Sequence, residues 1–109
     1  MSLNKTLAAA ALALGAVLSF GNAQAQAKDL KIGLVLSVSG PFADYGKQIQ
    51  HGIDLYMAEH GDTVAGRKVK LIVKDDTGMA PQIAKREAQQ LLINDKVDIL
   101  AGYDLTPNA

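Results

Sequence analysis

The stretch LKIGLVLSVSG, residues 30–40, decides the fold that this sequence predicts. Leu30 to Leu36 suits an extended strand that is apolar on both faces, with Gly33 and Val35 opposite a row of Leu and Ile side chains. Such strands are typical of parallel sheets that are covered on both sides. Ser37 to Gly46 is rich in Ser and Gly and carries a Pro, which predicts a loop directly beyond the strand.

Helix and strand patterns alternate through the rest of the chain. One helix is predicted from Asp44 or Tyr45 to His60, and a second from Ala80 to Lys96. Strands are predicted from Lys68 to Lys74 and from Val97 to Gly102, and the latter strand is expected to be fully buried. The apolar stripes of the two helices contain Ile49, Ile53, Tyr56, Met57 and His60, and then Ala84, Ala88, Leu91 and Leu92.

This order of elements predicts an α/β fold. A β-α-β-α-β series with right-handed crossovers forms the start of a doubly wound parallel sheet, here truncated at the C-terminus. Lys68, Lys70 and Lys74 alternate with apolar residues along the second strand, and charged residues of this kind suit an exposed sheet edge. The predicted strand order is therefore second, first, third.

The first 25 residues have the pattern of a secretory signal peptide. A short segment with one cation, Lys5, precedes the uncharged run from Leu7 to Phe20, which is shorter than the roughly 20 residues that span a bilayer. Small residues then offer a cleavage site after Ala25, with a second site after Ala27. Residues 1–25 are thus expected to be a signal peptide, and residues 26–109 the folded body of a periplasmic protein.

Composition excludes several classes of function. The chain has no Cys, which excludes a lipoprotein anchor, disulfides and Cys-based metal sites. It has 11 basic and 11 acidic residues, and removal of Lys5 with the leader leaves 10 against 11. A near-neutral body without a basic stripe argues against nucleic acid as a partner.

Enzymatic motifs are incomplete. Gly40 to Lys47 differs from a P-loop because five residues separate its glycines and Gln48 replaces the hydroxyl residue; no G-x-G-x-x-G follows the first strand. Asp75-Asp76 could be a metal or phospho-acceptor pair. The pair fits better as part of a turn, in which Asp side chains accept local backbone N–H groups. His51 and His60 have no partner at ligand spacing. We therefore expect no enzyme activity, no catalytic or metal-binding residue and no cofactor.

Ligands of open α/β sheets bind beyond the carboxyl ends of the strands. The loops after the first and third strands are expected to lie side by side, and the crevice between them is the predicted site. Its candidate ligand-binding residues are Ser39, Tyr45, Tyr103 and Thr106. Thr106 precedes an expected helix, whose N-terminal amides favour a carboxylate.

The first strand and the series Ser39-Gly40-Pro41-Phe42-Ala43-Asp44-Tyr45-Gly46 resemble the opening of the leucine/isoleucine/valine-binding protein family. The resemblance continues through Gly52, residues 64–67, Asp75-Asp76 and residues 97–102. It implies the type I periplasmic binding fold, with this chain forming the N-terminal part of the first of two lobes. It also implies that the Thr106 position supplies a hydroxyl to the ligand carboxylate and that Tyr45 covers the ligand.

The resemblance further implies a periplasmic substrate-binding component of an ABC importer. Its partners would be an inner-membrane ABC permease and a small ligand, such as an amino acid, an aromatic carboxylate or an amide. The family's acidic residue for an amino-acid ammonium lies in the second lobe, so the ligand stays open. The alternatives are a sensor or regulator on the same fold, and a flavodoxin-like or receiver-type enzyme domain.

Overall fold

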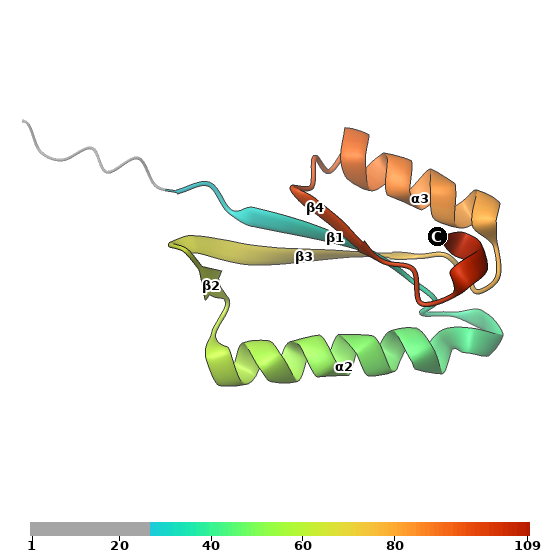
Figure 1. The fold of residues 1–109 in the computed structure, drawn as a ribbon, viewed down its shortest axis with the longest axis horizontal. Helices are drawn as coiled ribbons and strands as arrows, with labels where there is room; N and C mark the ends of the chain where they lie inside the picture. The colour runs from blue at the N-terminus through green and yellow to red at the C-terminus, as the bar shows by residue number, and fades with distance from the viewer. Residues whose placement is uncertain (1–26) are drawn as a thin grey trace, which may run out of the picture.

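The computed structural model describes residues 27–109, and the predicted signal peptide lies outside them. Two helices lie on opposite sides of a small sheet, and the parallel strands end at the same edge (Figure 1). In chain order the elements are β1 (Leu30–Leu36), the 3-10 turn η1 (Gly40–Phe42), α2 (Ala43–His60), β2 (Thr63–Val64), β3 (Arg67–Asp75), α3 (Pro81–Ile93), β4 (Ile99–Gly102) and the 3-10 turn η2 (Thr106–Asn108).

The sheet has the order β2-β3-β1-β4. β1 pairs in parallel with β3, with Leu34 beside Val73, and in parallel with β4, with Leu34 beside Ala101. The predicted order of the three parallel strands is therefore confirmed. The two-residue strand β2 was not predicted; it pairs antiparallel with the start of β3 through a tight turn whose two central residues, Ala65 and Gly66, both have positive φ.

One face of the sheet packs against α3. Val35, Ala84, Ala88 and Leu91 are buried together, and half-buried side chains from β3, β4 and the segment before β4 pack around them. Gly33 allows this close approach, because a Cβ there would stand 3.0 Å from the Leu91 methyl groups. This cluster is the main apolar core of the described residues. Burial of a Leu side chain such as Leu91 contributes about 1.5–3 kcal/mol to stability.

The α2 side of the sheet is covered less completely. Leu34 and Leu36 are buried, yet within α2 only Gly46 is buried among the described residues. The prediction of a core-facing stripe is wrong for Ile49, which is 38% exposed. It is also wrong for Tyr56 and His60, which stack on each other at the surface with ring centroids 4.3 Å apart. Ile53 and Met57 of the stripe are half-buried.

Three further expectations need correction. β4 is the outer strand of the described sheet, so it is not fully buried, and Ile99 is 45% exposed. α3 ends at Ile93 and not at Lys96, and β4 starts at Ile99 and not at Val97. Leu92 lies outside the buried face of α3 and is 52% exposed.

No helix within residues 27–109 has the length and apolar character needed to cross a membrane.

Candidate functional site

The loop after β1 is held by the acidic pair at the end of β3. The carboxylate of Asp75 accepts the backbone N–H groups of Val38 and Ser39 at 3.0 and 3.3 Å, and it also accepts the Ser39 hydroxyl. It accepts the N–H of Thr77 at 2.9 Å as well, which is the local turn contact that the sequence predicted. Asp75 therefore ties the loops after β1 and β3 together.

The same contacts set the charge state of Asp75. Partial burial raises the pKa of Asp75, but the hydrogen bonds from the Ser39 side chain and from the N–H groups of Thr77, Val38 and Ser39 outweigh that effect. The pKa of the carboxyl group lies below its ordinary value. Asp75 is therefore ionised at neutral pH and stabilises the loop.

Asp76 has a different, fully buried environment. Its carboxylate accepts the Ser37 hydroxyl at 2.8 Å, the Gly78 N–H at 3.1 Å and the Asn108 side-chain amide at 2.7 Å. The Asn108 oxygen in turn accepts the Ala80 N–H at 3.1 Å. The network joins the carboxyl ends of β1 and β3 and the start of α3 to η2. Its side chains, from Ser37, Asp76 and Asn108, are buried and hydrogen-bonded as a structural role requires.

A sharp turn follows β4. Gly102 and Tyr103 have φ values of 104° and 61°, and positive φ is uncommon for a residue as bulky as Tyr. A Cβ on Gly102 would stand 2.3 Å from the Val35 carbonyl oxygen, so the turn requires glycine. Beyond the turn, both carboxylate oxygens of Asp104 lie 3.2–3.3 Å from the Ser37 N–H, which places Asp104 beside the loop after β1.

A hollow of about 600 Å³ opens between the start of α2 and the segment after β4. Its size falls in the range of roughly 300–1,000 Å³ that is usual for small-molecule sites. The Phe42 and Tyr45 rings stack with centroids 6.1 Å apart and an interplanar angle of 15°. The lining residues are Phe42, Tyr45, Gln48, Ile49, Asp104 and Leu105.

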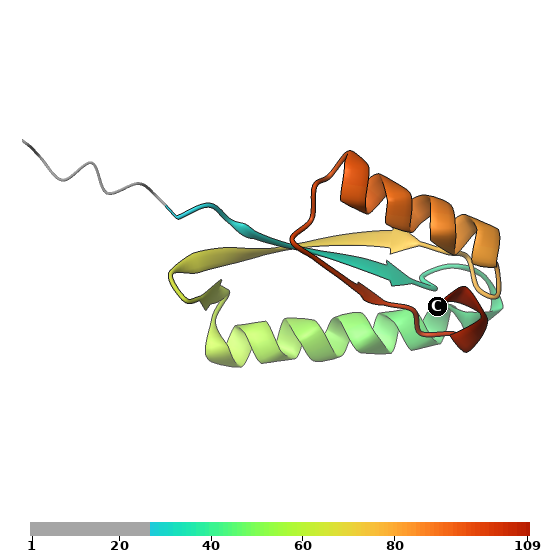
Figure 2. The same cartoon turned by 45° about the horizontal axis from the view of Figure 1, so that its top comes forward.

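Gly46 lets α2 start close to this edge. It is buried, and a Cβ there would stand 2.2 Å from the Ser37 carbonyl oxygen. Figure 2 shows the start of α2, the ends of the parallel strands and η2 gathered at one end of the fold. The predicted crevice between the loops after the first and third strands therefore corresponds to a hollow in the structure.

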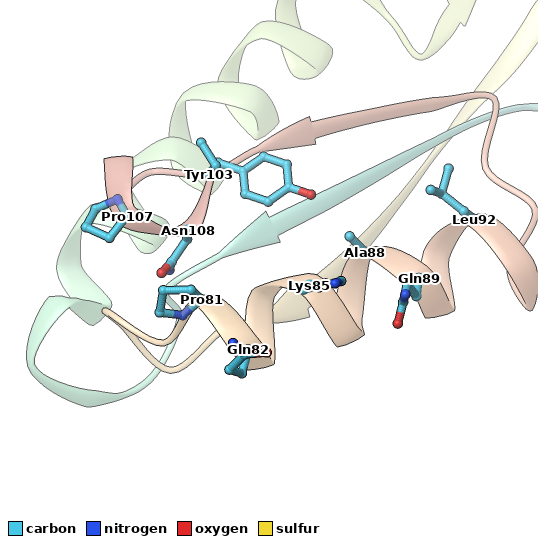
Figure 3. A pocket seen from close by; sticks show the side chains of 10 residues that line it. Pro81, Gln82, Lys85, Ala88, Gln89, Leu92, Tyr103, Pro107 and Asn108 are labelled. Carbon is cyan, nitrogen blue, oxygen red and sulfur yellow. The ribbon is translucent and has the colours of Figure 1, made fainter.

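Tyr103 lies on the other side of the sheet from Tyr45. Its ring packs against the core cluster beside α3 and faces a second hollow, of about 420 Å³, whose lining includes Pro81, Ala88 and Asn108 (Figure 3). The structure thus separates two tyrosines that the sequence placed in one crevice, because the turn at Gly102–Tyr103 directs the ring toward α3.

The other two candidates also lie outside the residues that line the Tyr45 hollow. Ser39 is exposed, and its hydroxyl donates to Asp75. Thr106 is exposed at the start of η2, directly after the lining residue Leu105. Sequence reasoning missed Phe42, Gln48, Ile49, Asp104 and Leu105, although the i, i+3, i+4 spacing of Tyr45, Gln48 and Ile49 on the predicted helix was an available signal.

No group of three or more His, Cys, Asp or Glu side chains in residues 27–109 is arranged to hold a metal ion. The contact of His60 is local: its Nδ1–H donates to the Tyr56 carbonyl oxygen at 3.1 Å. The chemistry gathered at the carboxyl edge consists of aromatic rings, the amide side chains of Gln48 and Asn108, hydroxyls and carboxylates. The described residues therefore form an α/β lobe with a hollow of small-molecule size at the carboxyl edge of its sheet.

Comparisons with known proteins give the same class. The sequence profile of the periplasmic binding protein family matches residues 29–109. The chain belongs to this family, as the resemblance predicted. It is 40% identical over 99 residues to "Leu/Ile/Val-binding protein homolog 6" of Brucella abortus, a match that covers 91% of this chain and 25% of that protein.

Solved structures from Rhodopseudomonas palustris share the fold. A solute-binding protein of an ABC transporter from strain BisB5, in complex with 3,4-dihydroxybenzoic acid, is 47% identical with a TM-score of 0.70. Another, in complex with 4-hydroxybenzoate, is 36% identical with a TM-score of 0.71. These matches cover 74% and 75% of this chain and 22% of each solved chain. The chain therefore spans about a quarter of the length of the proteins it resembles.

Proposed function

We propose that this chain forms the N-terminal part of the first lobe of a periplasmic substrate-binding component of an ABC importer. The protein would capture a small carboxylate-bearing or amino-acid-like solute between two lobes and deliver it to an inner-membrane permease. The observation that carries the proposal is the aromatic-lined hollow at the carboxyl edge of the sheet, in a chain that belongs to the periplasmic binding protein family. Transport binding proteins among its relatives support an importer over a sensor.

The ligand class rests on the same hollow. A stacked aromatic pair, Phe42 and Tyr45, suits a flat apolar body, and Ile49 and Leu105 extend the apolar lining. The two solved relatives named above hold hydroxylated benzoic acids, which supports an aromatic carboxylate as the first class to test. The name of the Brucella relative supports a branched aliphatic amino acid as the second.

Tyr45 and Thr106 are the ligand contacts in this proposal. Tyr45 is 55% exposed at the mouth of the hollow, where its ring can cover an apolar ligand. Thr106 is exposed beside Leu105, and its hydroxyl would donate to the ligand carboxylate. For Ser39 and Tyr103 we propose a role in holding the loop and the turn, which their contacts with Asp75 and the α3 core support.

The proposal includes export to the periplasm with removal of residues 1–25, and it includes no catalytic step, cofactor or nucleic acid. The test uses the full-length protein that carries this chain. Its melting temperature is measured with 3,4-dihydroxybenzoate, 4-hydroxybenzoate and leucine as separate probes. A probe at 100 times its dissociation constant adds about 2.7 kcal/mol to the free energy of unfolding, so at least one probe should raise the melting temperature. An unchanged melting temperature with all three would contradict the proposed ligand classes.

A further inference from the structure

Asp104 is the carboxylate that lines the hollow, and its hydrogen bonding is incomplete. Its two oxygens share a single backbone donor, the N–H of Ser37, at 3.2 and 3.3 Å. The Ser37 hydroxyl is also 3.2 Å away, but it lies closer to Asp76, at 2.8 Å, and its one hydrogen can serve only one acceptor. An ionised carboxylate has about four acceptor positions, so Asp104 retains capacity for a further donor.

Asp75 and Asp76, at the same edge of the sheet, each accept more hydrogen bonds than Asp104. Asp76 meets three donors in a fully buried position, and Asp75 meets three backbone N–H groups and a hydroxyl. Both are used within the fold. Asp104 differs because it is half-buried and forms part of the wall of the hollow.

Within residues 27–109, Asp75, Asp76 and Asp104 at this edge form no ion pair. Ion pairs between described residues involve the acids Asp29, Asp62, Asp95, Asp98 and Glu87, which leaves the three acids at the carboxyl edge without a Lys or Arg partner in residues 27–109. An acceptor group of a ligand would be repelled beside Asp104. A donor group would form a charge-assisted hydrogen bond, which is stronger than one between neutral groups.

We propose that Asp104 determines specificity in this hollow by selecting ligands that direct a hydrogen-bond donor, a phenolic hydroxyl or an ammonium group, toward its carboxylate. This inference rests on the proposed solute-binding function. The ligand's apolar body packs on the Phe42–Tyr45 pair, and in 4-hydroxybenzoate the carboxylate, para to the hydroxyl, lies away from Asp104.

The experiment compares matched probes by calorimetric titration of the full-length protein. Benzoate lacks the donor of 4-hydroxybenzoate, and 4-methylpentanoate lacks the ammonium of leucine. The first pair tests a phenolic donor and the second an ammonium donor. The wild-type protein should bind the donor-bearing member of at least one pair about tenfold or more tightly.

Asp104→Asn and Asp104→Ala should abolish most of that preference. Asn keeps an oxygen for the Ser37 N–H, so this variant remains informative if the Ala variant fails to fold. Asp98→Asn is the matched control. The Asp98 carboxylate also accepts a backbone N–H of β1, that of Lys31 at 3.0 Å, but Asp98 does not line the hollow. It should leave the preference unchanged.

Each outcome has one meaning. Loss of the preference in the Asp104 variants, with Asp98→Asn unchanged, supports the inference. An undiminished preference in folded Asp104 variants, or no preference in a wild-type protein that binds the probes, overturns the inference and leaves the proposed function standing. Failure of every probe to bind overturns the proposed ligand classes and the inference with them.

Discussion

Two glycines of α2 give a direct test of how the helix meets the loop after β1. A Cβ on Gly46 would stand 2.2 Å from the carbonyl oxygen and 2.8 Å from the carbonyl carbon of Ser37. These distances are roughly 1 Å inside the usual separation of about 3.5 Å, and both obstacles are backbone atoms. Gly52 lies on the same helix, and a Cβ there would meet nothing within 4 Å.

The same substitution should therefore have opposite effects at the two positions. Ala stabilises a helix interior by about 0.5–1 kcal/mol relative to Gly, and Gly52→Ala should raise the free energy of unfolding by that amount. Overpacking costs about 1–3 kcal/mol, and more where backbone must move, which outweighs the gain at Gly46. Gly46→Ala should lower the free energy of unfolding by about 1–2 kcal/mol or more.

Urea denaturation of the full-length variants, followed by circular dichroism, measures both values at once. Equal slopes against urea would show that the change is one of stability. Gly46→Ala should also weaken binding of whichever probe the wild-type protein binds, because α2 must move away from the loop that borders the hollow. Gly46→Ala with wild-type stability, or with the same sign as Gly52→Ala, would refute the close approach of α2 to Ser37.

Three other predictions concern the ligand, pH and processing. Thr106→Ala should weaken binding of a carboxylate probe about tenfold or more, because a hydrogen bond to a charged group is lost. Thr106→Ser keeps the hydroxyl and should change the affinity little, and calorimetric titration measures the affinity of both variants. The pKa of Asp75 is lowered in the fold, so its contribution to stability is fully present above the unfolded pKa of about 3.9 and is lost as the pH falls through the folded value. The stability difference between wild type and Asp75→Asn should thus shrink below about pH 4 in denaturation measurements. Mass spectrometry of the exported protein should find a mature N-terminus at Gln26 or Lys28.

Each of these has a clear contrary result. Unchanged affinity of a folded Thr106→Ala variant would remove the hydroxyl from the ligand site. A stability difference for Asp75→Asn that is constant from neutral pH to pH 3 would show that its carboxylate is not stabilised by the loop after β1. An exported protein that still begins at Met1 or Ser2 would contradict the signal peptide.

The sequence was sufficient for the order and type of the main elements. The apolar run Leu30 to Leu36 and the alternation of strand and helix predicted a parallel sheet, because hydrophobic periodicity and glycine positions are local properties. The alternating lysines of β3 predicted that this strand lies on the outer side of β1, because charge on a strand is also a local property. The short hairpin strand β2 escaped prediction, since two residues carry no periodicity.

Only the tertiary structure decided which side chains share a surface. Tyr45 and Tyr103 follow neighbouring strands, yet a left-handed turn at Gly102–Tyr103 places the second ring against α3 and leaves Asp104 beside Ser37. The buried network of Asp76 with Asn108 joins residues 32 positions apart. Backbone dihedral angles and long-range packing set these directions, and a one-dimensional pattern of residue types does not contain them.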